Sequence, residues 1–372
     1  MSTPALVPEA DALHGHVAPG TVACARAPLR ISFCGGGTDL MPYAAEHGGL
    51  VLSSTIGRYA YATMRPLPRR VVRVRSLDYG QVASYGLDEP LIFDGRFDLV
   101  TACLRRLRVN LQETGFDLFL ETHAPPGSGL GASSALVVAV LGAFDSWRHL
   151  NLDRYTIARL AYELERKDVG IAGGMQDQYA AAFGGFNLIE FRGEDDVIVN
   201  PLRIDSQVVH ELEYNSMLVF TGATRLSSRV IESQLKNVSA GKLQTLHAMA
   251  RMKQLALEAK AALLHGRLLD LGEILHEEWT HKKSISSSIT TNHIDHLYEE
   301  ARRHGALGGK VSGAGGGGFM FLLCPFDRKP AVVARLSALG GQAFPVEFCP
   351  QGLQSWLAYG LSSGRPEAAD PR

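Results

Sequence analysis

Apolar and polar residues follow two different patterns along the chain. Short runs rich in β-branched and aromatic residues predict strands, and longer runs with a helical period predict helices. The predicted strands are Ala23–Phe33, Gly49–Met64, Val71–Arg75, Phe116–Glu121, Phe186–Phe191, Ser216–Thr221 and the apolar end of Lys310–Cys324. The predicted helices are Phe97–Leu111, Ala135–Phe144, Tyr155–Lys167 with Asp153 as its N-cap, Lys242–His265 and Ile294–His304. Strands and helices therefore alternate through most of the chain.

The length of the chain predicts two domains. A chain of 372 residues is too long for one small core, and a hydrophobic content of 46% is enough to fill two. A change in composition near Tyr214 divides the folded part into residues 21–213 and 214–362. Residues 1–20 and 363–372 show no hydrophobic period, so we expect a mobile N-terminal arm and a flexible tail.

The net charge and the cysteine pattern indicate which partners and which compartment to expect. The formal net charge is -1, so no basic surface for nucleic acid or an anionic membrane is expected. The 5 cysteines form no CxxC pair, which favours a reducing compartment, and we expect the cytoplasm. The longest apolar run, about ten residues, falls well short of the ~20 that span a bilayer. The N-terminus lacks the pattern of a signal peptide. We expect a monomer or homodimer that acts on small molecules.

A glycine-rich segment between a predicted strand and a predicted helix points to phosphate binding. Residues 125–136 read P-P-G-S-G-L-G-A-S-S-A-L. Glycines leave the backbone N–H groups accessible, and the start of a helix adds unpaired donors and the positive end of its dipole. The residues expected to hold phosphate are Pro126, Gly127, Ser128, Gly129, Leu130, Gly131, Ala132, Ser133 and Ser134.

Three other segments accompany this loop. They are A-P-L-R-I-S-F-C-G-G-G-T-D-L at residues 27–40, an acidic segment at residues 163–178 that contains G-G-M-Q-D-Q, and G-G-K-V-S-G-A-G-G-G-G-F-M-F at residues 308–321. In this order the four segments resemble the GHMP small-molecule kinases over nearly the whole folded chain. The resemblance implies an α+β fold of two domains, with a left-handed β-α-β crossover in the first and a ferredoxin-like second domain.

The resemblance also implies roles for single residues. Asp177 and Arg30 would be catalytic, the glycine-serine loop would bind the phosphates of ATP, and Ser133 and Glu165 would bind Mg²⁺. The residues expected to contact the substrate are Gly36, Gly37, Thr38, Asp39, Gly174, Asp177, Arg225, Gly315 and Gly316. Simpler roles stay open for three of them: Asp39 as a helix N-cap, Glu165 as a solvated helix residue and Arg225 as a surface residue.

Within the family, the first segment is most similar to the sugar 1-kinase branch. Galactokinases carry Glu-His where this chain has Gly36-Gly37, which argues against galactose. The G-G-G-T-D form most closely resembles the bacterial heptose 7-phosphate 1-kinases. This resemblance implies ATP-dependent phosphorylation of the anomeric hydroxyl of D-glycero-D-manno-heptose 7-phosphate to the 1,7-bisphosphate, for nucleotide-activated heptose synthesis. The alternative within the family is another sugar 1-kinase, similar to fucokinase or galactokinase.

Other classes of function fit less well. Gly127, Gly129 and Ala132 match the GxGxxG/A fingerprint, so an NAD(P)-dependent oxidoreductase is the alternative from another class. That fingerprint requires an acidic residue at the end of a second strand, and Asp145 and Asp153 lie in helical sequence instead. A segment containing His276 and His281 only approximates a zinc motif, because the spacing is one residue too long. A sugar-phosphate sensor without activity ranks last, since the candidate catalytic residues are present.

Overall fold

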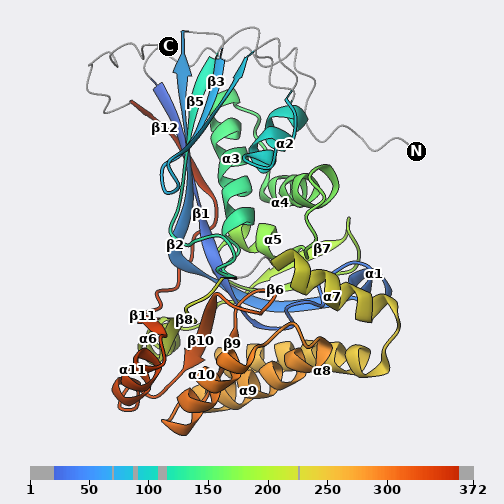
Figure 1. Ribbon diagram of the computed structural model, residues 1–372, viewed down its shortest axis with the longest axis vertical. Coiled ribbons are helices and arrows are strands. Elements are labelled where there is room, and N and C mark those ends of the chain that lie inside the picture. The colour runs from blue at the N-terminus through green and yellow to red at the C-terminus, as the bar shows by residue number, and fades with distance from the viewer. Residues whose placement is uncertain (1–20, 69–70, 87–90, 108–114, 225–226, 360–372) are drawn as a thin grey trace.

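The computed structural model describes residues 21–68, 71–86, 91–107, 115–224 and 227–359. Two β-sheets lie one above the other along the long axis of the molecule, and each is packed against helices (Figure 1). The described helices include none with the length and apolar character needed to cross a lipid bilayer. The expected mobile arm and flexible tail lie outside the described residues.

The larger sheet contains eight described strands in the order β12-β1-β2-β5-β3-β4, with β6 paired to β2 and β7 paired to β6. These strands are β1 (Thr21–Cys34), β2 (Gly49–Leu67), β3 (Val71–Ser76), β4 (Gln81–Gly86), β5 (Gly115–Thr122), β6 (Phe186–Phe191), β7 (Val197–Pro201) and β12 (Gln354–Tyr359). The first half of the long strand β2 pairs with β6 and its second half pairs with β5. Among the described strands, β3 and β5 form the one parallel pair.

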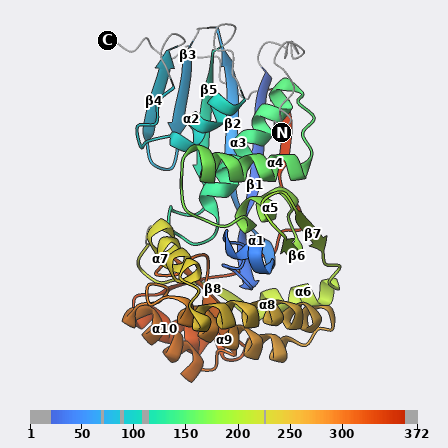
Figure 2. The same ribbon diagram turned by 90° about the vertical axis from the view of Figure 1, so that its right-hand side faces the viewer.

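Helices cover one face of this sheet, as Figures 1 and 2 show. They are α2 (Asp98–Arg106), α3 (Ala132–Arg148), α4 (Arg154–Glu163), a π-helical turn (Leu164–Asp168) and α5 (Gln176–Phe183), and the short α1 (Tyr43–His47) lies near the lower end of β2. Helix α3 packs directly on β1 and β2. Its run of small and apolar residues is buried almost throughout because the sheet lies on one side and other helices lie on the other.

The smaller sheet has the order β11-β8-β10-β9, and all its pairs are antiparallel. Its strands are β8 (Ser216–Phe220), β9 (Gly308–Val311), β10 (Phe319–Leu323) and β11 (Gln342–Phe344). The helices around it are α6 (Ser206–Tyr214), α7 (Ser227–Ser239), α8 (Leu243–Leu264), α9 (Leu268–Ile285), α10 (Asn292–Arg303) and α11 (Lys329–Ala338). Numbered within this sheet, the strand order is 4-1-3-2, with helices between the first and second strands and between the third and fourth. This is the ferredoxin-like arrangement that the family resemblance implies.

The end of the described chain corrects one part of the predicted domain division. Strand β12, which the sequence analysis places in residues 214–362, pairs antiparallel with β1 in the first sheet. Tyr359 is opposite Thr21, and Gln354 is opposite Arg26. The first strand therefore has no open edge over this stretch, because the chain returns from the second domain to cover it.

The two halves of the molecule share a continuous core. The largest hydrophobic cluster contains residues of both sheets, together with residues of α3, α8 and α9. Phe33 of β1 lies edge-on against Phe321 of β10, with ring centroids 5.4 Å apart. Residues next to the segments at 35–39, 125–131 and 312–318 belong to this shared core, namely Cys34, Ala124, Ala132 and Phe319. The core therefore fixes the relative positions of the three glycine-rich loops.

Candidate active site

The glycine-serine loop connects β5 to α3, as the sequence predicts. Gly127, Gly129 and Gly131 have φ angles of 73°, 78° and 75°, in the left-handed region that favours glycine. Gly131 immediately precedes the first residue of α3. The buried side chain of Leu130 anchors the loop in the core. The backbone and the start of a 17-residue helix thus form the cradle expected for an anion, with N–H groups not used by the helix.

The third glycine-rich segment packs directly on this loop. A Cβ atom on Gly129 would lie 2.4 Å from the carbonyl oxygen of Ser312, and one on Gly318 would lie 2.3 Å from that of Ser128. The N–H of Phe319 donates to the carbonyl oxygen of Ser128 at 2.9 Å. Glycine is required at these positions because backbone meets backbone. The two glycine-rich loops are therefore in direct backbone contact.

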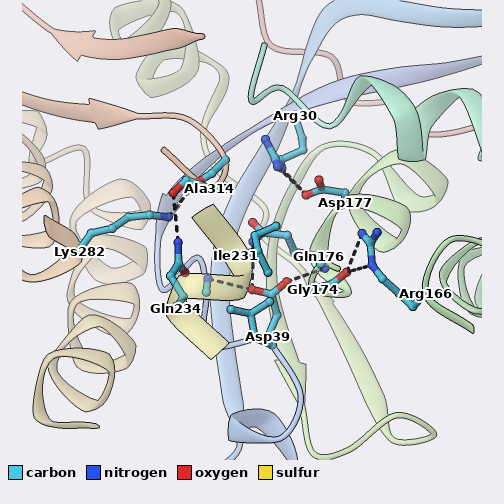
Figure 3. Close-up of a pocket in the computed structure, with 14 residues that line it drawn as sticks. Arg30, Asp39, Arg166, Gly174, Gln176, Asp177, Ile231, Gln234, Lys282 and Ala314 are labelled. Atoms are coloured by element: carbon cyan, nitrogen blue, oxygen red, sulfur yellow. Dashed lines mark hydrogen bonds and ion pairs between the residues drawn. The ribbon is translucent and has the colours of Figure 1, made fainter. Parts of the chain in front are cut away.

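Arg30 and Asp177 form the charged centre of the site (Figure 3). The Nε and Nη2 atoms of Arg30 lie 2.7 and 2.6 Å from Oδ1 of Asp177. The Nη1 atom of Arg30 donates to the carbonyl oxygen of Gly129 at 2.6 Å, which ties the pair to the phosphate loop. Arg30 is almost fully buried within β1, between two irregularities in the β1–β2 register. Burial of an unpaired guanidinium is costly, so the carboxylate partner stabilises this placement.

The free oxygen of Asp177 faces the start of α3. A Cβ atom on Gly131 would lie 3.4 Å from Oδ2, and within the described residues this oxygen accepts no hydrogen bond. The arrangement therefore leaves one carboxylate oxygen available beside the phosphate cradle. A hydroxyl group in the pocket could donate its proton to this oxygen.

Asp39 closes the opposite side of the pocket and binds the start of α5. Its Oδ2 accepts the backbone N–H of Gln176 and its Oδ1 accepts the side-chain amide of Gln176, both at 3.0 Å. Its Oδ1 also accepts the N–H of Gly37 at 2.9 Å. A Cβ atom on Gly174 would lie 1.9 Å from Oδ2 of Asp39, so glycine is needed there for the carboxylate to reach this position.

Glu165 lies in a buried hydrogen-bond network with Ser134, not with Ser133. The Oε2 atom of Glu165 accepts from the hydroxyl of Ser134 at 3.0 Å and from Gln178 at 3.1 Å, and it pairs with Arg166 at 2.9 Å. Burial raises the pKa of Glu165, and the Arg166 guanidinium opposes that rise. The sequence alternative of a solvated Glu165 is wrong, because the side chain is 1% exposed.

The Mg²⁺ site that the resemblance implies for Ser133 and Glu165 remains a prediction, because the two side chains form no hydrogen bond with each other within the described residues. Ser133 is exposed on the first turn of α3, and within the described residues it has no hydrogen bond to Glu165. The oxygen of Glu165 that has partners already carries an ion pair, while Oε1 is buried without a partner. The described part of the chain also lacks any group of three His, Cys, Asp or Glu side chains suited to a metal ion. We therefore assign no step of the chemistry to a metal held by this pair.

The second domain contributes pocket residues that the sequence analysis did not identify. Ile231 and Gln234 come from α7 and Lys282 comes from α9, and all three line the pocket with Arg30 and Asp177 (Figure 3). Gln234 donates to the carbonyl oxygen of Ala314 at 3.2 Å. No local motif marks these residues, because they lie on amphipathic helices whose sequence resembles that of any helix packed on a sheet.

The other expected substrate residues lie in different surroundings. Thr38 is buried, and its hydroxyl donates to the carbonyl of Gly35 and accepts from Leu50, so it fastens the loop to β2. The N–H of Gly316 donates to the carbonyl of Ile289 at 2.7 Å, and a Cβ on Gly315 would meet the same carbonyl. Gly313 and Ala314, rather than Gly315 and Gly316, line the pocket. Arg225 lies outside the described residues.

Comparison with known proteins agrees with this geometry. The model described as GHMP kinases N terminal domain matches residues 98–185, and the model described as GHMP kinases C terminal matches residues 259–342. D-glycero-alpha-D-manno-heptose 7-phosphate kinase of Campylobacter jejuni is 39% identical over 331 residues, which cover 88% of this chain and 97% of that protein.

Solved structures give the same result. A D-glycero-D-manno-heptose 1-phosphate kinase from Bacteriodes thetaiotaomicron is 37% identical, with a TM-score of 0.74 over 90% of this chain and 98% of that one. The Lactococcus lactis galactokinase complexed with galactose also has a TM-score of 0.74, over 90% of this chain and 95% of that one, but at 21% identity it shows the fold alone. The similarities do not favour the NAD(P)-dependent alternative. The chain therefore belongs to the GHMP kinase family and is a sugar kinase, a phosphotransferase with an alcohol group as acceptor.

Proposed function

We propose that this kinase uses ATP to phosphorylate the anomeric hydroxyl of D-glycero-D-manno-heptose 7-phosphate, which gives the 1,7-bisphosphate and ADP. The observation that carries the proposal is the Arg30–Asp177 pair beside Gly131 at the start of α3. Asp39 lies in the same pocket and offers a carboxylate to the hydroxyls of a sugar. The heptose 7-phosphate kinase of Campylobacter jejuni, which is similar over nearly its full length, supports this substrate.

The phosphate loop, Asp177 and Arg30 each have a separate role in the proposed reaction. The phosphate loop and the start of α3 hold the ATP phosphates. The Oδ2 atom of Asp177 accepts the proton of the sugar hydroxyl, while the hydroxyl oxygen forms a bond to the γ-phosphorus and the bond to the β-phosphate oxygen breaks. Arg30 offsets the negative charge that develops between the nucleophile and the phosphoryl group. Phosphoryl transfer depends mainly on such positioning and charge stabilisation. The family implies that ATP brings Mg²⁺, whose charge would lower repulsion among the phosphates.

Gly36 and Gly37, which stand where galactokinases carry two larger side chains, support a longer sugar than galactose. Gly37 lines the pocket, and a Cβ atom there would approach Oε1 of Gln234 at 3.4 Å. The names of two similar proteins differ on the sugar phosphate: one is a heptose 7-phosphate kinase and the other a heptose 1-phosphate kinase. We propose a 7-phosphate substrate, because the proposed reaction needs an unphosphorylated anomeric hydroxyl and the heptose 7-phosphate kinase is similar over 97% of its length.

The experiment is a kinetic comparison of substrates with product identification. Heptose 7-phosphate, heptose 1-phosphate, unphosphorylated heptose, L-fucose and galactose are each incubated with ATP, and ³¹P NMR locates the new phosphate. We expect the highest kcat/KM for heptose 7-phosphate and a product phosphorylated at both ends. A clear preference for any other sugar, or for heptose 1-phosphate, would overturn the substrate proposal.

The phosphate of the substrate provides a second test. We propose Arg225 as the residue that binds the 7-phosphate, since a guanidinium binds phosphate through two parallel hydrogen bonds. Replacing Arg225 with Ala should raise KM for heptose 7-phosphate by about tenfold or more while KM for the unphosphorylated heptose stays nearly constant. Equal changes for the two sugars would remove Arg225 from phosphate binding.

A further inference from the structure

Helix α9 presents two buried charged side chains to the first glycine-rich loop. Glu278 and Lys282 are four residues apart and therefore lie on the same face of the helix. Their side chains are 0% and 3% exposed. Burial of a charge is unfavourable unless the charge has partners, so the contacts of these two residues indicate why they are placed there.

Each of the two side chains joins the loop of residues 35–39, here called the sugar loop, to the third glycine-rich segment. Glu278 accepts the backbone N–H of Gly35 at 3.1 Å and the ammonium of Lys310 at 3.0 Å. Lys282 donates to the carbonyl oxygen of Gly36 at 3.1 Å and to that of Gly313 at 2.9 Å. The two residues thus form a clamp with two points of attachment, from the second domain onto a loop of the first.

We propose that Glu278 and Lys282 set the sugar loop, and through it Asp39, for sugar binding: Glu278 is a positioning residue, and Lys282 both holds the loop and donates to a sugar hydroxyl. This inference rests on the proposed function. The sugar loop transmits the clamp to Asp39 by short hydrogen bonds: the N–H of Thr38 donates to the carbonyl of Gly35, and the N–H of Gly37 donates to Oδ1 of Asp39. A displacement of Gly35 or Gly36 therefore moves the carboxylate that faces the pocket.

Lys282 also lines the pocket wall itself. Its ammonium has three N–H groups, and two of them are used by the carbonyls of Gly36 and Gly313. The third has no hydrogen-bond acceptor within the described residues. Lys282 thus adds a charged donor to a pocket whose other wall carries Asp39, and a sugar hydroxyl is a suitable acceptor for it.

The electrostatic surroundings make the clamp sensitive to pH. Burial lowers the pKa of Lys282 to about 7; Lys310 and Arg30 lower it too, whereas Glu278 and Asp39 act in the opposite direction. The ammonium form is present below that pH and is lost as the pH rises through it. The neutral amine has one N–H fewer, so we expect sugar binding to weaken above about pH 7.

The test compares Lys282→Met with Lys283→Met, its neighbour on α9, whose ammonium pairs with Asp295 instead. Calorimetry measures binding of heptose 7-phosphate without ATP, and kinetics measure KM for each substrate. For Lys282→Met we expect the sugar Kd and KM to rise about 10- to 100-fold, while KM for ATP stays within about twofold. Lys283→Met should match wild type. Equal sugar affinity in all three proteins would overturn the clamp.

Two further measurements distinguish a specific effect on sugar binding from a general loss of folding. Glu278→Gln keeps the shape of the side chain but loses the charge paired with Lys310, and it should raise the sugar Kd several-fold with ATP binding intact. In wild type and Lys283→Met, kcat/KM for the sugar should fall above about pH 7, and in Lys282→Met this fall should be absent. An unchanged pH profile in Lys282→Met would contradict the role of its ammonium. Wild-type enzyme inactive on heptose 7-phosphate would instead overturn the proposed function.

Discussion

Three consecutive residues at the start of α5 each contact a different part of the site. Gln176 binds Asp39, Asp177 pairs with Arg30, and Gln178 joins the buried network of Ser134 and Glu165. Successive helical residues point about 100° apart, so a single turn can serve three directions. The G-G-M-Q-D-Q segment therefore acts as a junction between the sugar side, the catalytic pair and the support of α3.

The role of the Asp177 carboxylate as the base can be tested by replacing one of its oxygen atoms. Asp177→Asn keeps an oxygen that can accept from Arg30 but cannot accept a proton from the sugar. We expect kcat to fall roughly 10²- to 10⁴-fold with little change in KM for ATP. Steady-state kinetics check this, and a melting curve close to that of wild type shows that the variant folds. A variant with kcat near the wild-type value would exclude Asp177 as the base.

Glu165 distinguishes a structural role from a metal role. Its buried contacts with Ser134, Gln178 and Arg166 predict that Glu165→Gln lowers stability by about 1–3 kcal/mol, because Arg166 loses its charged partner. We expect the Mg²⁺ concentration for half-maximal activity to stay unchanged. Denaturant unfolding and Mg²⁺ titrations measure the two quantities. If Ser133→Ala and Glu165→Gln both raised the Mg²⁺ requirement, without additivity in the double variant, the two side chains would share an ion after all.

At the scale of elements, the contact between two glycine-rich loops depends on the lack of side chains. Gly129 and Gly170 have nearly the same φ angle, +78° and +79°. A Cβ on Gly129 would lie 2.4 Å from the carbonyl oxygen of Ser312, whereas a Cβ on Gly170 would have nothing within 4 Å. The two positions therefore separate backbone strain from the packing of the loops.

We expect Gly129→Ala to be more harmful than Gly170→Ala. Both substitutions cost about 1–2 kcal/mol for the left-handed conformation, and Gly129→Ala costs about 1–3 kcal/mol more because the loops must separate. Only Gly129→Ala should raise KM for ATP, since only that substitution displaces the phosphate loop. Chemical unfolding and ATP kinetics of both variants give the comparison. Equal losses in the two variants would show that the close packing of the loops has no energetic effect.

At the scale of the whole molecule, the two sheets are joined by a shared core and by the return of the chain. Phe321 of β10 packs on Phe33 of β1, and β12 pairs with β1 after the chain has completed the second sheet. The catalytic pocket lies where these connections hold the glycine-rich loops together. Unfolding of one half would therefore expose apolar surface of the other.

This shared core predicts one cooperative unfolding transition. Phe321→Ala should lower the stability of the whole molecule by about 3–5 kcal/mol, because it removes a fully buried ring at the junction. Calorimetry and circular dichroism should show a single transition in both proteins, shifted to lower temperature in the variant. Two separate transitions in wild type, with only one of them moved by Phe321→Ala, would mean that the halves unfold independently.

The sequence by itself determined the features that depend on neighbouring residues. Asp153 caps α4 by accepting the N–H of Thr156, the apolar run after Ser134 forms the buried α3, and alternate glycines form the phosphate loop. The family fold and the kinase activity also followed from motifs of this local kind. Such features are encoded within a few residues, where propensity, capping and glycine geometry act directly.

Only the tertiary structure decided which of these features meet. The choice of Ser134 over Ser133 as the partner of Glu165 depends on the rotation of α3 against its neighbours. Lys282 reaches Gly36 across 246 positions of sequence, and β12 crosses back to β1. Contacts between residues so far apart in sequence form because helices and strands bury their apolar faces against each other. A charged residue on such a face is brought close to its partner by the same packing. The helical period of α9 marks its buried face, but it does not show which loop that face will meet.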